Sequence, residues 1–187
     1  GSSMSGAFTF RRNGERLSVT VPRGEVRGGS GDVLLALSRL NVSQEPGGTP
    51  RVAGNFTTGG GGLPQASGRM ERGPDGRLTM RLAMAEYRAG SARLAMPRLL
   101  LSQARNGALG FAGEARVSGD FPGGRADGLV LPLNGNWSSA GGLALWRGCT
   151  PLAFERLQLG ELTLDSKRLT LCPPKDSAIV RSDANGF

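Results

Sequence analysis

The chain has 187 residues, a formal net charge of +8 and no histidine, and it combines 31 glycines and 11 prolines with only 5% aromatic residues. Without histidine it cannot form a Ser-His-Asp or Cys-His relay, a histidine-ligated metal site or an imidazole base near neutral pH. A hydrophobic content of 38% is low for a compact enzyme but sufficient for a sheet with one buried face.

Apolar and polar residues alternate along most of the chain. In the first clear run, residues 16–21, Leu17, Val19 and Val21 share one face and Ser18 and Thr20 the other. This period of two is typical of a half-buried strand. Turn clusters separate the alternating runs, and the spacing of roughly 12 to 25 residues between successive runs favours an antiparallel meander over βαβ units. The alternation recurs at Leu78/Met80/Leu82/Met84, Leu94/Met96, Leu109/Phe111, Leu129/Leu131/Leu133, Leu143/Leu145, Leu157/Leu159, Leu162/Leu164 and Leu169/Leu171.

Two tight hairpins are predicted from turn chemistry. Asn13-Gly14 lies between residues 8–10 and 17–19, and an Asn-Gly pair favours the two positive φ angles of a type I′ turn. The segment 73–76, Gly-Pro-Asp-Gly, predicts a second reversal before Leu78.

Two segments also allow a helix, because Leu and Met prefer helices to strands. Asp32 is a possible N-cap for a short helix over residues 32–40, which would place Val33, Leu37 and Leu40 on one side. Residues 78–87 could also coil, but their alternation and the preceding turn favour a strand.

Five short segments resemble one another, each with a central glycine flanked by small or polar residues. Glycines inside strands indicate bends or close backbone approaches, and such a series suits a strongly coiled sheet. Chance matches from glycine enrichment are the alternative. The segments are residues 51–56, 66–70, 111–115, 117–121 and 133–137.

Two cysteines, Cys149 and Cys172, enclose three short alternating runs separated at residues 160–161 and 165–167. If these runs fold back on one another, the two cysteines can approach closely enough for a disulfide, which would indicate an oxidising compartment such as the periplasm. Two unpaired buried thiols are the alternative. Two cysteines without histidine make a poor zinc site, so no metal is expected.

The segment that these cysteines flank resembles a known family. Trp146-Arg-Gly-Cys149, residues 154–160 (Phe-Glu-Arg-Leu-Gln-Leu-Gly) and residues 169–173 (Leu-Thr-Leu-Cys-Pro) are similar to the cysteine-flanked strand segment of YdbH-type AsmA-like proteins of Gram-negative bacteria. The match is concentrated in the cassette at residues 146–173. The resemblance implies a membrane-anchored chain that builds a long, curved β-groove along which lipids cross the periplasm.

The resulting fold prediction is all-β: a strongly curved, twisted antiparallel sheet that forms a groove or half-barrel with an apolar concave face, with one short helix as an option. Residues 1–4 are interpreted as a tag remnant, and residues 5–187 as a single domain cut from a longer chain. The same apolar residues could instead form the closed core of a β-sandwich. The predicted groove lining is Leu17, Val19, Val21, Leu78, Met80, Leu82, Met84, Leu94, Met96, Leu109, Phe111, Leu129, Leu131, Leu133, Leu143, Leu145, Leu157 and Leu159.

No catalytic activity and no cofactor are expected. Glu155, Glu161 and Asp165 cluster in the cassette, but Glu155 should face solvent, and Asp165 should serve the turn that follows it. The glycines at 59–62 lack the Gly-Lys-Ser/Thr of a phosphate loop.

The expected function is one section of a periplasmic bridge that carries phospholipid acyl chains between the inner and outer membranes. An inner-membrane anchor and an outer-membrane factor would contact other parts of the longer chain. The alternative is a structural or interaction β-module of a cell-envelope protein. The scattered arginines, with few aromatics, argue against nucleic acid; they are either solvated or weakly attracted to anionic head groups.

Overall fold

The structure is a computed structural model that describes residues 1–182 and, within that range, all side chains except those of residues 166 and 167. The described residues form thirteen β-strands and no helix, and the strand pairs are antiparallel. The all-β, antiparallel prediction is therefore confirmed.

Contacts between residues group the chain into two units. Unit 1 comprises residues 1–84 and 102–106, and unit 2 comprises residues 85–101 and the chain from 107 onward. The prediction of a single domain over residues 5–187 stays a prediction.

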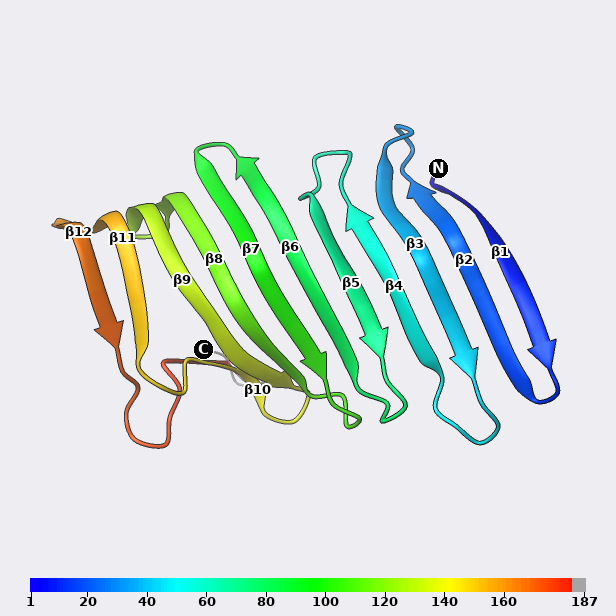
Figure 1. Cartoon of the computed structure of the whole chain (residues 1–187). Coiled ribbons are helices and arrows are strands. Elements are labelled where there is room, and N and C mark those ends of the chain that lie inside the picture. Colours follow the sequence, from blue (N-terminus) through cyan, green and yellow to red (C-terminus); the bar gives the residue numbers. More distant parts are fainter. Residues whose placement is uncertain (183–187) are drawn as a thin grey trace. The chain divides into compact units, whose positions relative to one another are not determined.

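Unit 1 is a meander in which each strand pairs with the next along the chain (Figure 1). Both predicted hairpins are present, one between β1 and β2 and one between β5 and β6. The strands are β1 (Ser3–Asn13), β2 (Arg16–Arg27), β3 (Val33–Gln44), β4 (Arg51–Thr58), β5 (Ala66–Arg72) and the first part of β6 (Leu78–Ala89).

Unit 2 is built around its longest strand, β9 (Gly124–Ser138). β8 pairs with one edge of β9, while β10 and β11 share the other edge; β12 extends the sheet from β11, and β13 pairs with β10. Unit 2 also contains the last part of β6 and all but the last two residues of β7 (Ala92–Gln103). Its remaining strands are β8 (Leu109–Phe121), β10 (Gly142–Leu145), β11 (Thr150–Leu159), β12 (Leu162–Leu171) and β13 (Val180–Ser182).

The structure corrects three details of the sequence analysis. The helix over residues 32–40 is wrong, because this segment pairs as β3 with strands on both its edges, and those ladders outweigh the helix preference of leucine. The first hairpin has Gly14 and Glu15 as its loop, with positive φ at Gly14 alone (62°), which fits a type II′ turn rather than type I′. Residues 165–167 form no turn, because they lie inside β12, where Asp165 pairs with Arg156 of β11.

The strands of each unit contain irregularities of register, which we call its bulge row. At these positions the alternation of side chains between the two faces is reversed. In unit 1 the register shifts in β1 at residues 7–9 and in β3 at residues 38–41, where Arg39 has a φ of 51°. In unit 2 it shifts between Val117 and Gly119, opposite Gly128, which has a φ of 62°. Such bulges bend a strand and increase its twist. Because the alternation reverses at the bulge and the apolar positions in the sequence shift by one there too, the apolar residues on both sides of it lie on the same face.

Phenylalanine rings lie over glycines directly across the strand pairs. Phe56 pairs with Gly68, Phe111 with Gly135 and Phe121 with Gly124. A Cβ added at these glycines would lie 2.9, 2.6 and 2.9 Å from the tip of the facing ring. The missing side chain therefore makes the space that the ring fills, an arrangement known to rescue glycine-weakened strands. Gly68 and Gly135 are central glycines of two of the five similar segments.

We expect Gly68→Ala to destabilise unit 1. The new Cβ would lie 2.5 Å from the Arg81 carbonyl oxygen, so the backbone must shift, at a cost of about 1–3 kcal/mol. The matched control is Gly24→Ala in β2, where the nearest atom is 3.6 Å away and the substitution should be neutral or slightly stabilising. Urea unfolding followed by circular dichroism measures both, and equal midpoints would contradict the close approach.

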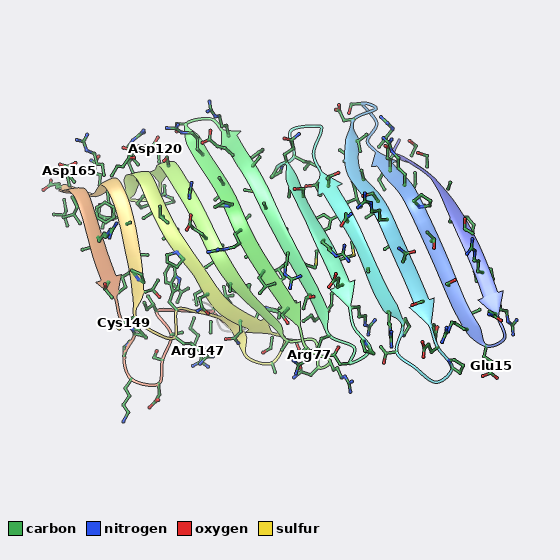
Figure 2. All side chains as sticks on the ribbon, viewed as in Figure 1. Glu15, Arg77, Asp120, Arg147, Cys149 and Asp165 are labelled. Carbon is green, nitrogen blue, oxygen red and sulfur yellow. A yellow bond between two sulfur atoms is a disulfide. The ribbon has the colours of Figure 1, made fainter. Side chains whose placement is uncertain are left out.

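The predicted disulfide is also confirmed. Cys149 and Cys172 are bonded, with their Cα atoms 4.0 Å apart, at the open end of the β11–β12 hairpin, where Thr150 pairs with Leu171 (Figure 2).

We expect the double variant Cys149→Ser/Cys172→Ser to lose about 3 kcal/mol of stability, because the bond closes a 23-residue separation in the unfolded chain. Thermal unfolding of the variant, beside the wild type with and without reductant, measures this loss. Reductant should lower the melting temperature of the wild type and leave that of the variant unchanged. If reductant does not change the melting temperature of the wild type, the disulfide does not stabilise the fold and the prediction is wrong.

Candidate functional site

Most of the larger apolar residues of unit 1 share one face of its sheet. The register aligns Val19 with Val42 and Val42 with Val52, and it aligns Val21 with Leu40. Farther along the same face, four β6 residues pair with β5: Leu78 with Arg72, Met80 with Met70, Leu82 with Gly68 and Met84 with Ala66. These cross-strand rows produce a continuous face of valine, leucine, methionine and Phe56.

Unit 2 has a corresponding face. Leu131 pairs with Ala115, Leu129 with Val117, and Leu109 with Trp137. The face continues through β11 and β12, where Leu157 pairs with both Ala126 and Leu164. Leu159 in turn pairs with Gly124 of β9 and Leu162 of β12, so the face extends from β8 to β12.

Most of this apolar surface is only half-buried. The described strands of each unit belong to a single hydrogen-bonded sheet, so within residues 1–182 no second sheet of the same unit packs on either face. Leu17, Leu94 and Leu159 remain 36%, 37% and 45% exposed. Among the described residues, the buried hydrophobic ones are Phe56, Met84, Ala115, Ala126, Ala144, Leu152 and Phe154, and no large side chain is fully enclosed.

The predicted lining residues divide between the units. Leu17, Val19, Val21, Leu78, Met80, Leu82 and Met84 lie on the face of unit 1, and the others belong to strands of unit 2. Several residues of these faces could not be predicted from the sequence, because their segments also fit a short helix, a glycine-rich fragment or the flank of a cysteine. They are Leu40, Val42, Val52, Phe56, Met70, Leu152 and Phe154.

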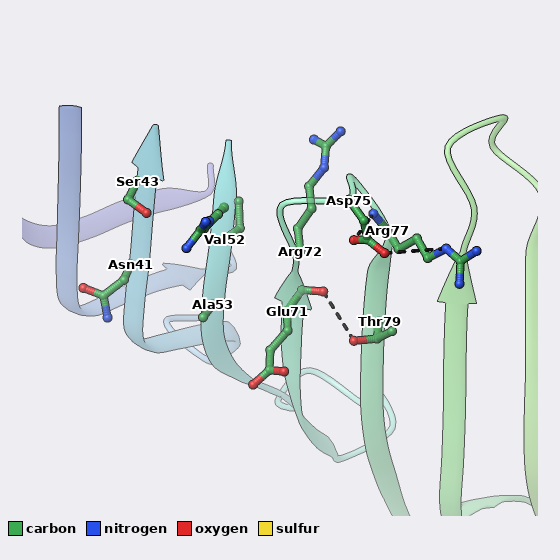
Figure 3. A pocket seen from close by; sticks show the side chains of 11 residues that line it. Asn41, Ser43, Val52, Ala53, Glu71, Arg72, Asp75, Arg77 and Thr79 are labelled. Atoms are coloured by element: carbon green, nitrogen blue, oxygen red, sulfur yellow. Dashed lines mark hydrogen bonds and ion pairs between the residues drawn. The ribbon is translucent and has the colours of Figure 1, made fainter. Parts of the chain in front are cut away.

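The opposite face of unit 1 is polar and ends in a shallow hollow of about 440 Å³ (Figure 3). Ala53 and Glu71 contribute from the polar face, and Val52 and Arg72 contribute from the apolar one, so the hollow lies at the ends of the strands where the two faces meet. The Thr79 hydroxyl donates a hydrogen bond to the Glu71 carbonyl oxygen at 3.4 Å.

A second hollow, of about 640 Å³, lies beside the bulge row of unit 2. Glu155 and Asp165 both line it, whereas Glu161 is in the turn between β11 and β12. Arg156 bonds Asp165 at 2.7 Å, and this hydrogen bond raises the pKa of the Arg156 guanidinium. Asp165 is thus held in an ion pair within β12.

Within residues 1–182, no group of three or more acidic or cysteine side chains is arranged to hold a metal ion. The part of the chain that the structure describes contains no helix long and apolar enough to cross a bilayer. Comparison with family models, with curated proteins and with solved structures finds no significant match.

One carboxylate on unit 1 holds two arginines. Glu25, whose side chain is 10% exposed, accepts hydrogen bonds from Arg23 at 2.5 Å and from Arg27 at 2.7 Å. The bond from Arg23, followed by that from Arg27, lowers the pKa of Glu25 below its ordinary value of 4.5. A lowered folded-state pKa means that stabilisation is present above the unfolded-state value and is lost as the pH falls through the folded-state one.

We therefore expect Glu25→Gln to be less stable than the wild type at neutral pH, with a difference that shrinks as the pH falls below about 4.5. Chemical unfolding at pH 7, 5 and 3 measures this. Glu15→Gln, in the β1–β2 turn, is the control, because Glu15 has no ion-pair partner among the described residues. A pH-independent difference for Glu25→Gln would contradict the linkage.

Proposed function

We propose that this chain is a section of a periplasmic, bridge-like lipid-transport protein of the AsmA-like type, whose apolar sheet face carries phospholipid acyl chains between the inner and outer membranes. The observation that carries the proposal is the half-exposed leucine and methionine face, which has no covering layer within either unit. A β-sandwich would bury these side chains under a second sheet.

The dimensions and chemistry of the face suit an acyl chain. Strands about 4.8 Å apart give the rows across β1–β6 a length of about 24 Å. Leucine and methionine are flexible and carry no hydrogen-bonding group, so they provide a surface on which an acyl chain can slide. Each methylene removed from water contributes about 0.8 kcal/mol, so ten of them would favour binding by about 8 kcal/mol before ordering costs.

The disulfide supports the proposed location. Disulfides persist in the oxidising periplasm and are rare in a reducing cytosol. Cys149 and Cys172 bracket the segment that resembles the YdbH-type proteins, and their bond is part of the structure. In this proposal the membrane anchor and the outer-membrane factor interact with other parts of a longer chain.

Organic extraction of the purified protein followed by mass spectrometry tests the proposal, with a mock purification as control. Phospholipid in near-stoichiometric amount is the expected result. Its absence from folded, disulfide-bonded protein, also after incubation with phospholipid vesicles, would contradict the proposal and favour a structural module.

We expect Met80→Asp to fold and to lose bound phospholipid several-fold, because a charge on the uncovered face stays hydrated but repels acyl chains. The matched control is Ala83→Asp, which places the same charge on the same strand but on the polar face, where Ala83 pairs with Ser67. Circular dichroism monitors folding, and mass spectrometry quantifies lipid. Unfolding of Met80→Asp alone would indicate a closed core, and unchanged lipid would exclude this face from binding.

A further inference from the structure

The two ends of the unit 1 strands differ in charge. One end of the strands contains the turns β1–β2, β3–β4 and β5–β6, together with residues 102–106. Glu15 and Arg77, which are labelled in Figure 2, lie at this end. Residues 11–16, 44–51, 72–77 and 102–106 contain seven arginines and three carboxylates. The opposite end, residues 22–33 and 57–66, contains two arginines and two carboxylates.

Ion pairing increases this difference. At the balanced end, Glu25 bonds both arginines. At the arginine-rich end, Arg16 pairs with Glu45 at 3.2 Å and Arg77 with Asp75 at 3.6 Å, but the other arginines there have no acidic partner among the residues that the structure describes.

Four arginines of this end form what we call the arginine rim: Arg12, Arg51, Arg72 and Arg105. Arg12 donates to the Gly14 carbonyl oxygen and Arg105 to the Asp75 carbonyl oxygen. Within the described part of the chain, no carboxylate lies within ion-pair distance of Arg51 or Arg72. The rim thus presents positive charge that the unit itself does not neutralise.

The arginine rim borders the apolar face directly. Arg12 pairs with Leu17, and Arg72 pairs with both Val52 and Leu78, so these two arginines occupy positions in the apolar rows. Arg51 and Arg72 both line the hollow at this end, where Figure 3 shows Arg72 pointing away from Glu71. An amphiphile lying on the apolar face would therefore meet guanidinium groups where that face ends.

We propose that the arginine rim binds the phosphates of anionic phospholipids whose acyl chains lie on the apolar face of unit 1. This inference rests on the proposed function and adds a head-group preference to it. A guanidinium can bind a phosphate through two parallel hydrogen bonds, and it keeps its charge at any physiological pH. A zwitterionic head group brings an ammonium that the rim repels, so lipids with a net negative charge bind preferentially.

The test uses two lipids with the same acyl chains. The protein is incubated with vesicles of dioleoylphosphatidylglycerol and dioleoylphosphatidylcholine in equal amounts at low salt and separated from them, and the bound lipids are quantified by mass spectrometry. We expect about a fivefold preference for phosphatidylglycerol, the ratio that one arginine near an anionic lipid surface supplies. The preference should decrease as salt is raised.

Arg51→Gln/Arg72→Gln should lower this ratio while total bound lipid changes little, because two of the four rim arginines lose their charge. The matched control, Arg39→Gln/Arg81→Gln, removes the same charge from exposed arginines of unit 1 that lie outside the rim segments. A wild-type ratio of one, or an equal loss of preference in both double variants, would overturn the head-group inference alone. No bound lipid of either kind would overturn the proposed function and this inference with it.

Discussion

Contact between neighbouring strands within a single layer holds each unit together. Since no second sheet among the described residues of either unit packs on its strands, a side chain is buried mainly by the residues beside it and across from it. The pairs of Phe56 with Gly68 and Phe111 with Gly135 show the consequence, because a ring covers the space that the facing glycine leaves. At these two positions the glycine is therefore a packing requirement of the single-layer sheet.

The bulge rows let such a sheet bend without dividing its apolar surface. The reversal at Arg39 in unit 1 and at Gly128 in unit 2 keeps leucines on both sides of the bulge on the same face. On the other face of unit 2, the bulge row leaves a hollow in which Arg156 pairs with Asp165. Apolar chemistry is thus concentrated on one face, and charge lies on the other face or at the strand ends.

An apolar face without a covering layer favours aggregation unless something occupies it. The disulfide and the ion pairs of Glu25 stabilise the fold without adding a layer over that face, so they leave it accessible. The proposed lipid-carrying function requires this combination, because in that proposal the acyl chains of a bound lipid take the place of a second layer. The arginine rim gives the edge of the same face a chemistry that suits the polar end of that substrate.

The strands, the β5–β6 turn and the disulfide could be predicted from the sequence, because alternation, turn residues and cysteine placement are local signals. The helix option at residues 32–40 and the turn at residues 165–167 were wrong, because only pairing with neighbouring strands decides between strand and helix, or between strand and turn: residues 33–44 pair on both edges, and β12 pairs with β11. The gathering of Arg12, Arg51 and Arg72 along one edge also depends on register, which fixes how residues far apart in sequence align across strands. The sequence by itself determined that the strands have an apolar side; only the tertiary structure decided that no second layer covers that side within its unit, since burial depends on what packs against a strand.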